Sequence, residues 1–195
     1  MSGPSPERAE AFWKHWARFA ASGNLSAEAL ESAYDEGARL LRRYDEALGL
    51  EVQDGASGNP GLLITAFGNP DHRASVGDLM AAKPDIPGLD VVAFRPAHKE
   101  DFEFEIEGYA FDTTQMWFGM LGDDDDPAFL GLDMYFRKEQ LAPDDVLITA
   151  AGLAAQTLMG EVAFMEKVGL LRLGDRNADP TEFVPLVMLK KLAHD

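Results

Sequence analysis

Five polar side chains come just after two short apolar runs, in positions where they could bind or act on a small ligand. The runs cover residues 62–67 and 89–94, and we expect them to be neighbouring parallel strands. The carboxyl ends of such strands lie at one edge of the sheet, where α/β proteins commonly bind ligands. The five residues are Asn69, Asp71, His72, Arg95 and His98.

These residue types suit an anionic ligand. A helix that starts near residue 70 offers free backbone N–H groups, and Arg95 can pair with a carboxylate or a phosphate. With Asp71, His72 and His98 close by, the pattern predicts an enzyme or a small-anion-binding protein. The alternative is a polar helix cap beside a surface arginine, because polar residues collect at sheet edges in any fold.

A second candidate site is a row of acidic side chains that alternate with apolar ones. The alternation predicts a half-buried strand over residues 102–107, with one apolar face and one acidic face. Like charges on one strand face repel, so a cross-strand arginine, a metal ion, a basic partner or water must offset them. The acidic residues are Asp101, Glu103, Glu105 and Glu107, and they are candidate contacts to a basic protein.

Four successive aspartates, residues 123–126, fall in a predicted hairpin loop. A calcium loop needs alternating oxygen ligands, a glycine at the bend and a bidentate glutamate at its end. This run has neither the alternation nor the terminal glutamate, so we interpret it as a solvated loop. The sequence assigns no metal site and no cofactor.

Several catalytic motifs are absent from the sequence. The histidines at positions 15, 72, 98 and 194 form no HxxxH, HxH or HExxH arrangement. There is no GxSxG elbow, no nucleotide-binding loop and no cysteine, which excludes disulfides and thiolate chemistry. No residue is therefore predicted to be catalytic.

The net charge of the chain limits its partners. Lys and Arg number 17 and Asp and Glu number 34 among 195 residues, which gives a formal charge of −17. Nucleic acids and anionic membranes are poor partners for such a chain, whereas a basic protein is a suitable one. The alternative explanation of the high net charge is that it only keeps the protein soluble. The mostly apolar stretch at residues 146–155 is too short to span a bilayer. We therefore expect a soluble, cytoplasmic protein.

The elements that position these residues begin with two helices. Ser5 and Pro6 signal a helix start, and large rings at residues 12, 13, 16 and 19 share one face. Ser26 caps a second amphipathic helix that runs to about Leu48. The short link between the two predicts an antiparallel hairpin. Residues 61–96 then predict a strand, a helix stopped by Pro84 and a second strand, which make one β-α-β crossover.

The rest of the chain predicts strands followed by helices. Strands are expected at residues 50–53, 115–121, 129–136 and 164–173, and helices at 142–159 and 181–192. The resulting prediction is a single α+β domain over residues 1–195, with a flexible tail at residues 1–5. It has an N-terminal helical hairpin, a mixed, mostly antiparallel sheet of about six or seven strands containing one β-α-β crossover, and two C-terminal helices.

The order of several short segments resembles a bacterial α+β domain family of unknown function. The segments are FWKHWARF, LGLEV, LLITAFGN, IPGLDVVAFRP and LMGE. That family has an FWxWF-like start to its first helix and an AFRP strand end. In this sequence two residues separate Trp13 from Trp16 instead of one, and Leu89 takes the place of a tryptophan. The resemblance implies an α+β fold and transfers no activity, cofactor or catalytic residue.

Two functions are compatible with these patterns. The first is a non-catalytic, acidic protein-interaction module, similar to immunity proteins and inhibitors, that binds a basic partner through Asp101, Glu103, Glu105 and Glu107. The second is an enzyme or small-anion-binding protein with a site near Asp71, His72, Arg95 and His98. We expect the first, because the sequence is acidic and lacks catalytic motifs.

Overall fold

The computed structural model describes residues 3–121, 129–140 and 142–193. Within these ranges the chain is α+β, with six α-helices and nine strands in three sheets, and this confirms the predicted fold class. The chain divides into two compact units, which we call unit 1 (Met1–Arg95) and unit 2 (Pro96–Asp195). The sequence predicts one domain over these residues. Each unit is described by itself below.

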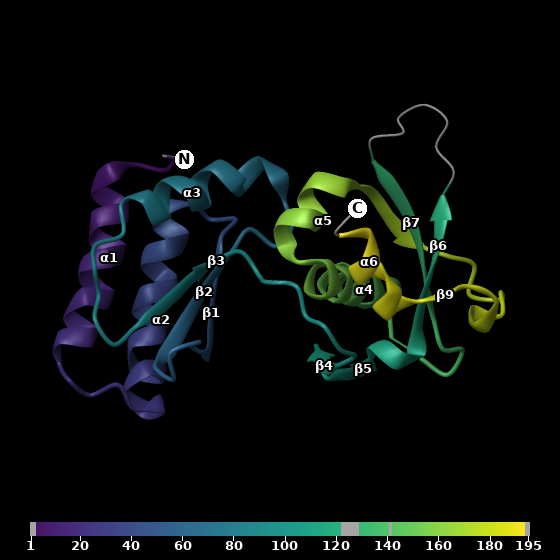
Figure 1. Cartoon of the computed structure of the whole chain (residues 1–195), viewed down its shortest axis with the longest axis horizontal. Helices are drawn as coiled ribbons and strands as arrows, with labels where there is room; N and C mark the ends of the chain where they lie inside the picture. Colours follow the sequence, from purple (N-terminus) through teal and green to yellow (C-terminus); the bar gives the residue numbers. More distant parts are fainter. Residues whose placement is uncertain (1–2, 122–128, 141, 194–195) are drawn as a thin grey trace. The chain divides into compact units, whose positions relative to one another are not determined.

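Unit 1 begins with the predicted helical hairpin, α1 (Pro6–Ala21) and α2 (Ala27–Tyr44) (Figure 1). The Ser5 hydroxyl accepts a hydrogen bond from the N–H of Arg8, and the Ser26 hydroxyl caps α2 in the same way. Such caps satisfy backbone donors that the first turn of a helix leaves free. The ring-bearing face of α1 is buried in the core of unit 1, so these aromatic rings anchor the helix.

A three-stranded sheet completes unit 1. Its strands are β1 (Gly49–Asp54), β2 (Pro60–Thr65) and β3 (Asp90–Ala93), in the order β1-β2-β3. β1 and β2 are antiparallel, while β2 and β3 are parallel and are joined through the short helix η1 (Pro70–His72) and α3 (Arg73–Ala81). This arrangement confirms the predicted β-α-β crossover.

Unit 2 contains a two-stranded and a four-stranded sheet. β4 (Glu103–Ile106) and β5 (Tyr109–Asp112) form the first. The second has the order β8-β7-β6-β9, made from β6 (Met116–Leu121), β7 (Leu130–Phe136), β8 (Val168–Leu173) and β9 (Val184–Pro185). The helices are α4 (Asp144–Met159), α5 (Glu161–Lys167) and α6 (Leu189–Leu192). Alanines of α4 pack with Met116, Phe118, Leu132 and Met134 in the core of this unit.

The structure differs from the sequence prediction in three places. The strands are divided among three sheets instead of one mixed sheet. The first part of the strand expected at 164–173 is helical, because α5 begins directly after Gly160 and buries Met165. The helix expected at 181–192 is reduced to two short 3-10 helices, η3 (Pro180–Glu182) and η4 (Leu186–Met188), and α6. Pro185 restricts Val184 to extended backbone, and these two residues pair with β6 as β9.

The junction between α4 and α5 requires glycine. Gly160 has φ of +83° and ψ of 140°, a conformation that is essentially restricted to glycine. A Cβ at this position would also lie 3.1 Å from the backbone nitrogen of Ala97. We therefore expect Gly160→Ala to lower the free energy of unfolding by about 1–3 kcal/mol, measured by urea denaturation. Gly152→Ala is the control, because a Cβ at that position inside α4 would make only an ordinary contact, 3.9 Å from Nε2 of Gln156, and the change should stabilise the protein.

Candidate functional sites

The β4–β5 hairpin positions the predicted acidic row. Its two-residue turn is Glu107-Gly108, with φ of +52° and +82°, which is typical of the turn that suits the twist of a hairpin. The register places Glu103 opposite Asp112 and Phe104 opposite Phe111. Glu107 therefore lies in the turn and does not continue the acidic face of β4.

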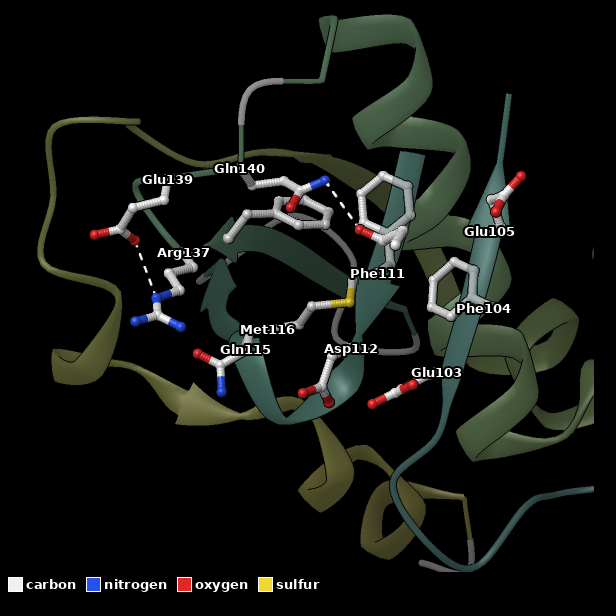
Figure 2. Close-up of a pocket in the computed structure, with 12 residues that line it drawn as sticks. Glu103, Phe104, Glu105, Phe111, Asp112, Gln115, Met116, Arg137, Glu139 and Gln140 are labelled. Atoms are coloured by element: carbon white, nitrogen blue, oxygen red, sulfur yellow. Dashed lines mark hydrogen bonds and ion pairs between the residues drawn. The ribbon is translucent and has the colours of Figure 1, made fainter. Parts of the chain in front are cut away.

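A cavity of about 650 Å³ opens beside this hairpin (Figure 2). Its apolar lining, which we call the aromatic floor, comes from β4, β5, β6 and β7. The floor consists of Phe104, Phe111, Met116 and Phe136. Carboxylates also line the cavity: they belong to Glu103, Glu105, Asp112 and Glu139. We refer to the whole cavity as the acidic pocket.

The aromatic floor is built from rings in contact. Phe104 and Phe111 are stacked, with ring centroids 5.3 Å apart and an interplanar angle of 21°. Phe136 meets Phe111 edge to face at 6.0 Å. On the side of α4, Phe111 packs in one cluster with Val146, Leu147 and Ala150. The floor is therefore part of the packed core of unit 2, and its shape is fixed by that packing.

The charges around the acidic pocket do not cancel. Arg137 is the basic residue that lines it, and its Nε lies 3.0 Å from Glu139, so this pair is neutralised. Asp112 accepts hydrogen bonds from the N–H and the hydroxyl of Thr114, at 2.8 and 2.6 Å. Glu103 and Glu105 are exposed, and neither forms an ion pair with another described residue. Figure 2 shows Glu103 and Asp112 on the same side of the hairpin, where like charges repel.

The four predicted partner-binding residues take different positions. Glu103 and Glu105 line the acidic pocket, and Glu107 lies in the turn. Asp101 accepts a hydrogen bond of 2.9 Å from the hydroxyl of Thr113, and that hydroxyl in turn accepts from the N–H of Phe102. Thr113 is buried, so Asp101 supports the start of the hairpin. The pocket carboxylates Asp112 and Glu139 were not predicted, because they come from other segments of the chain.

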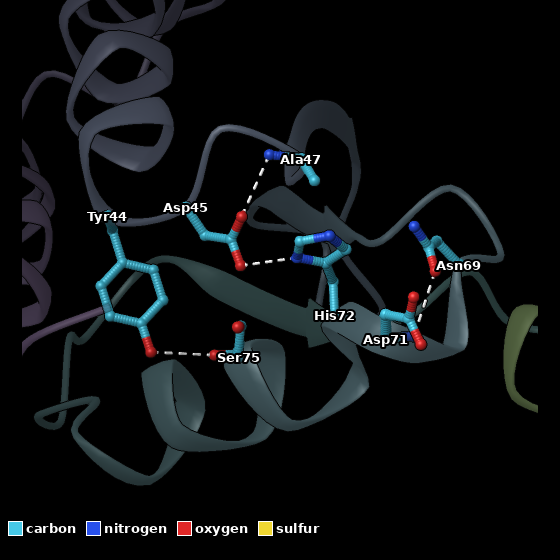
Figure 3. Close-up of polar contacts among 7 residues, drawn as sticks. All are labelled: Tyr44, Asp45, Ala47, Asn69, Asp71, His72 and Ser75. Atoms are coloured by element: carbon cyan, nitrogen blue, oxygen red, sulfur yellow. Dashed lines mark hydrogen bonds and ion pairs between the residues drawn. The ribbon is translucent and has the colours of Figure 1, made fainter. Parts of the chain in front are cut away.

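In unit 1, three of the five residues of the other predicted site gather at η1 (Figure 3). Asn69 caps this short helix by accepting a hydrogen bond of 3.0 Å from the N–H of Asp71, at the helix start that the sequence predicts near residue 70. The side chain of Asp71 is exposed. His72 turns toward the end of α2, where its Nδ1 lies 2.8 Å from Oδ2 of Asp45.

The remaining two residues of that site are engaged elsewhere. Arg95 pairs with Glu51 of β1 at 2.5 Å, and its side chain is 18% exposed. His98 belongs to unit 2, where its ring packs against Phe102 at 5.5 Å and its backbone N–H donates to Thr157. Arg95 is thus held by Glu51, a carboxylate on its own sheet.

Asp45 is a residue that the sequence does not single out. Its side chain is 7% exposed, and it accepts hydrogen bonds from His72, from the Ser75 side chain and from the N–H of Ala47. Burial raises the pKa of Asp45, but the hydrogen bonds outweigh burial and hold the pKa below its usual value. The carboxylate is therefore ionised and fixes the orientation of the His72 imidazole.

Other groups next to Asp45 are also ordered. The Tyr44 hydroxyl donates a hydrogen bond of 3.0 Å to the carbonyl of Ser75. Burial, followed by the charges of Asp78 and Asp45, raises the pKa of Tyr44, so the phenol remains protonated and can donate. Three hydrogen bonds thus join the end of α2 to the start of α3: Tyr44 donates to the Ser75 carbonyl, and His72 and the Ser75 side chain donate to Asp45.

Among the described residues, no three His, Asp or Glu side chains are grouped so that they could hold a metal ion. His194 and the aspartates at 123–126 lie outside the described residues. Within the part of the chain that the structure covers, no single helix has the length and apolar character to cross a membrane. α4 and α5 have the required length and apolar character only when they are taken together, and the chain bends by 109° between them.

Comparisons with models of protein families, with curated proteins and with solved structures find no match for this chain. The resemblance to a bacterial domain family therefore stays a prediction. The candidate sites are argued from their geometry and charge alone.

Proposed function

We propose that the protein is a non-catalytic interaction module that binds a basic segment of a partner protein in the acidic pocket. The observation that carries this proposal is the combination of an aromatic floor with Glu103 and Glu105, two exposed carboxylates that form no ion pair with another described residue. Guanidinium and ammonium groups are attracted to the faces of aromatic rings and form charge-assisted hydrogen bonds to carboxylates. A side chain of Arg or Lys offers both the apolar stem and the charged head that such a pocket accommodates.

The distribution of charge along the chain supports this proposal. Unit 2 has 8 Lys and Arg against 20 Asp and Glu, a formal charge of −12. Unit 1 has 9 against 14, which gives −5. The unit that contains the acidic pocket therefore carries most of the negative charge. A field of this sign increases the rate at which a basic partner associates and disfavours acidic partners.

The role resembles that of acidic immunity proteins and inhibitors, which act by covering a basic surface. A pocket of about 650 Å³ suits one or two side chains of such a surface. The bacterial origin and the cytoplasmic location that the sequence suggests belong to the same proposal.

The test compares charge reversals in the two units. The double variant Glu103→Lys/Glu105→Lys is expected to weaken binding of arginine-rich and lysine-rich peptides by about tenfold or more, because two attractive charges become repulsive. Calorimetric titration with peptides of about ten residues measures this, and binding should weaken as salt rises. The matched control is Glu10→Lys/Glu31→Lys, which makes the same change in charge at exposed positions of α1 and α2.

Equal weakening by the pocket variant and the control would mean that the whole field attracts the peptide, without a site. Absence of saturable binding by the unaltered protein would contradict the proposal directly. A further variant, Phe104→Leu, keeps the charges and removes an aromatic face. It should weaken the binding of arginine-rich peptides while changing the thermal midpoint of unfolding only a little.

A further inference from the structure

A second cavity, of about 240 Å³, lies in unit 1 at the end of α2. One wall is the N-terminal segment, and another is the last turn of α2 with the residues that follow it. Arg8 holds these walls together, because its Nη1 donates to the carbonyl of Gly3 at 3.2 Å and to that of Arg43 at 2.7 Å. The carbonyl of Gly3 is therefore joined through Arg8 to the end of α2.

His72 lines this cavity with a fixed imidazole. Its Nδ1 lies 2.8 Å from the Asp45 carboxylate, which can only accept, so Nδ1 carries the hydrogen. The side chain of His72 is 29% exposed. Nε2 is the nitrogen left for another partner. Asp45 also binds the N–H of Ala47 and the Ser75 side chain, so its charge is already solvated by the protein.

Two arginines also line the cavity. Arg42 and Arg43 are exposed, and neither forms a salt bridge with another described residue. Glu46, which is exposed, is one carboxylate of the lining, and Asp45, which is hydrogen-bonded to His72, is the other. The lining thus combines two arginines and one oriented imidazole with two carboxylates, of which Asp45 is hydrogen-bonded to protein donors and Glu46 is exposed.

We propose that this cavity binds a small, singly protonated phosphate, held by Arg42 and Arg43, with the P–OH of the phosphate donating a hydrogen bond to Nε2 of His72. Guanidinium groups form paired hydrogen bonds with phosphate oxygens, which favours this class of anion. The cavity is smaller than the pockets that hold drug-sized molecules, so the ligand is free phosphate or a compact phosphate monoester. This site is separate from the acidic pocket, whose charge would repel such a ligand.

The experiment titrates the whole chain with inorganic phosphate and, separately, with ribose 5-phosphate. Isothermal titration calorimetry gives the affinities, and side-chain ¹H–¹⁵N correlation spectra report the ring nitrogens of His72. We expect saturable binding and a shift of the His72 Nε2 resonance. Tighter binding of ribose 5-phosphate identifies a monoester as the ligand, and equal affinity identifies phosphate alone.

Two variants test the assignment. Arg42→Gln/Arg43→Gln is expected to weaken the affinity for phosphate about tenfold or more. The control Lys14→Gln/Arg18→Gln removes two exposed charges of α1 and should change this affinity less than about twofold. His72→Asn keeps an N–H donor for Asp45 but has no counterpart of Nε2. It should weaken the binding of phosphate without lowering the thermal midpoint of unfolding. No saturation by about 20 mM phosphate, or equal losses in the arginine variant and the control, would overturn the proposal. An unmoved His72 resonance would overturn it even if a variant failed to fold.

Discussion

Replacing Trp16 by alanine is expected to lower the stability of unit 1 by about 3–5 kcal/mol, the cost typical of removing a large buried ring. The indole is 0% exposed in the core of unit 1. It meets the rings of Phe12 and Phe19 edge to face, at centroid distances of 6.3 and 5.8 Å. The rings of Phe12 and Phe19 cannot close the space that alanine would leave, so the cavity term adds to the loss of apolar burial.

This variant also tests how the chain is divided. Hydrogen exchange measured by mass spectrometry should show faster exchange in peptides from residues 6–95 and little change in peptides from 96–193. The reciprocal variant, Leu132→Ala, removes a side chain that is 0% exposed in unit 2 and should produce the opposite pattern. If either variant accelerates exchange equally in both units, the chain unfolds as the single cooperative domain that the sequence predicts.

The parts of the fold that sequence patterns predict well are local. The helical hairpin follows from two serine caps and two amphipathic stripes, and the crossover follows from Pro70, Pro84 and the apolar runs on either side. The division of the strands among three sheets is not visible in the sequence. Alternation tells which face of a strand is buried, but it does not tell which strands pair, because pairing depends on contacts between distant segments.

The candidate sites show the same limit. The helix start after Asn69 is predicted because Pro70 and the polar residues on either side of it are neighbours in the chain. The partner of His72 is not predicted, because Asp45 lies 27 residues earlier in the chain. It comes directly after a helix, where a charged residue has no distinctive pattern. Arg95 is likewise assigned to a ligand by its place after a strand, whereas Glu51, 44 residues earlier, takes up its charge.

The sequence predicts only Glu103 and Glu105 among the carboxylates of the acidic pocket, for a physical reason. Glu103 and Glu105 belong to one alternating strand, so period-two patterning places them on one face. Asp112 joins them through the hairpin register, and Glu139 joins them from the segment after β7. A charged pocket built from three segments therefore needs the tertiary structure, even when its first strand is well predicted.

Replacing Asp45 by alanine is expected to lower the free energy of unfolding by about 2–4 kcal/mol at neutral pH. The carboxylate serves three donors, His72 Nδ1, the N–H of Ala47 and the Ser75 side chain, and its own side chain is 7% exposed. Donors that lose a partner in a buried place cost more than the net value of each bond. Urea denaturation at about pH 7 measures the loss. The control is Asp71→Ala, which removes an exposed carboxylate from the neighbouring short helix and should cost little.

The dependence of this loss on pH identifies the charge as its source. The pKa of Asp45 is lowered in the folded protein relative to its ordinary value of 3.8, so the unfolded chain binds the proton more tightly. The stabilisation by the carboxylate is therefore fully present above the unfolded pKa and is lost as pH falls through the folded pKa. The difference between the unaltered protein and Asp45→Ala should accordingly be smaller at about pH 2.5 than at about pH 7. A difference that stays constant over this range would show that packing, and not the ionised carboxylate with its hydrogen bonds, accounts for the stability that Asp45 provides.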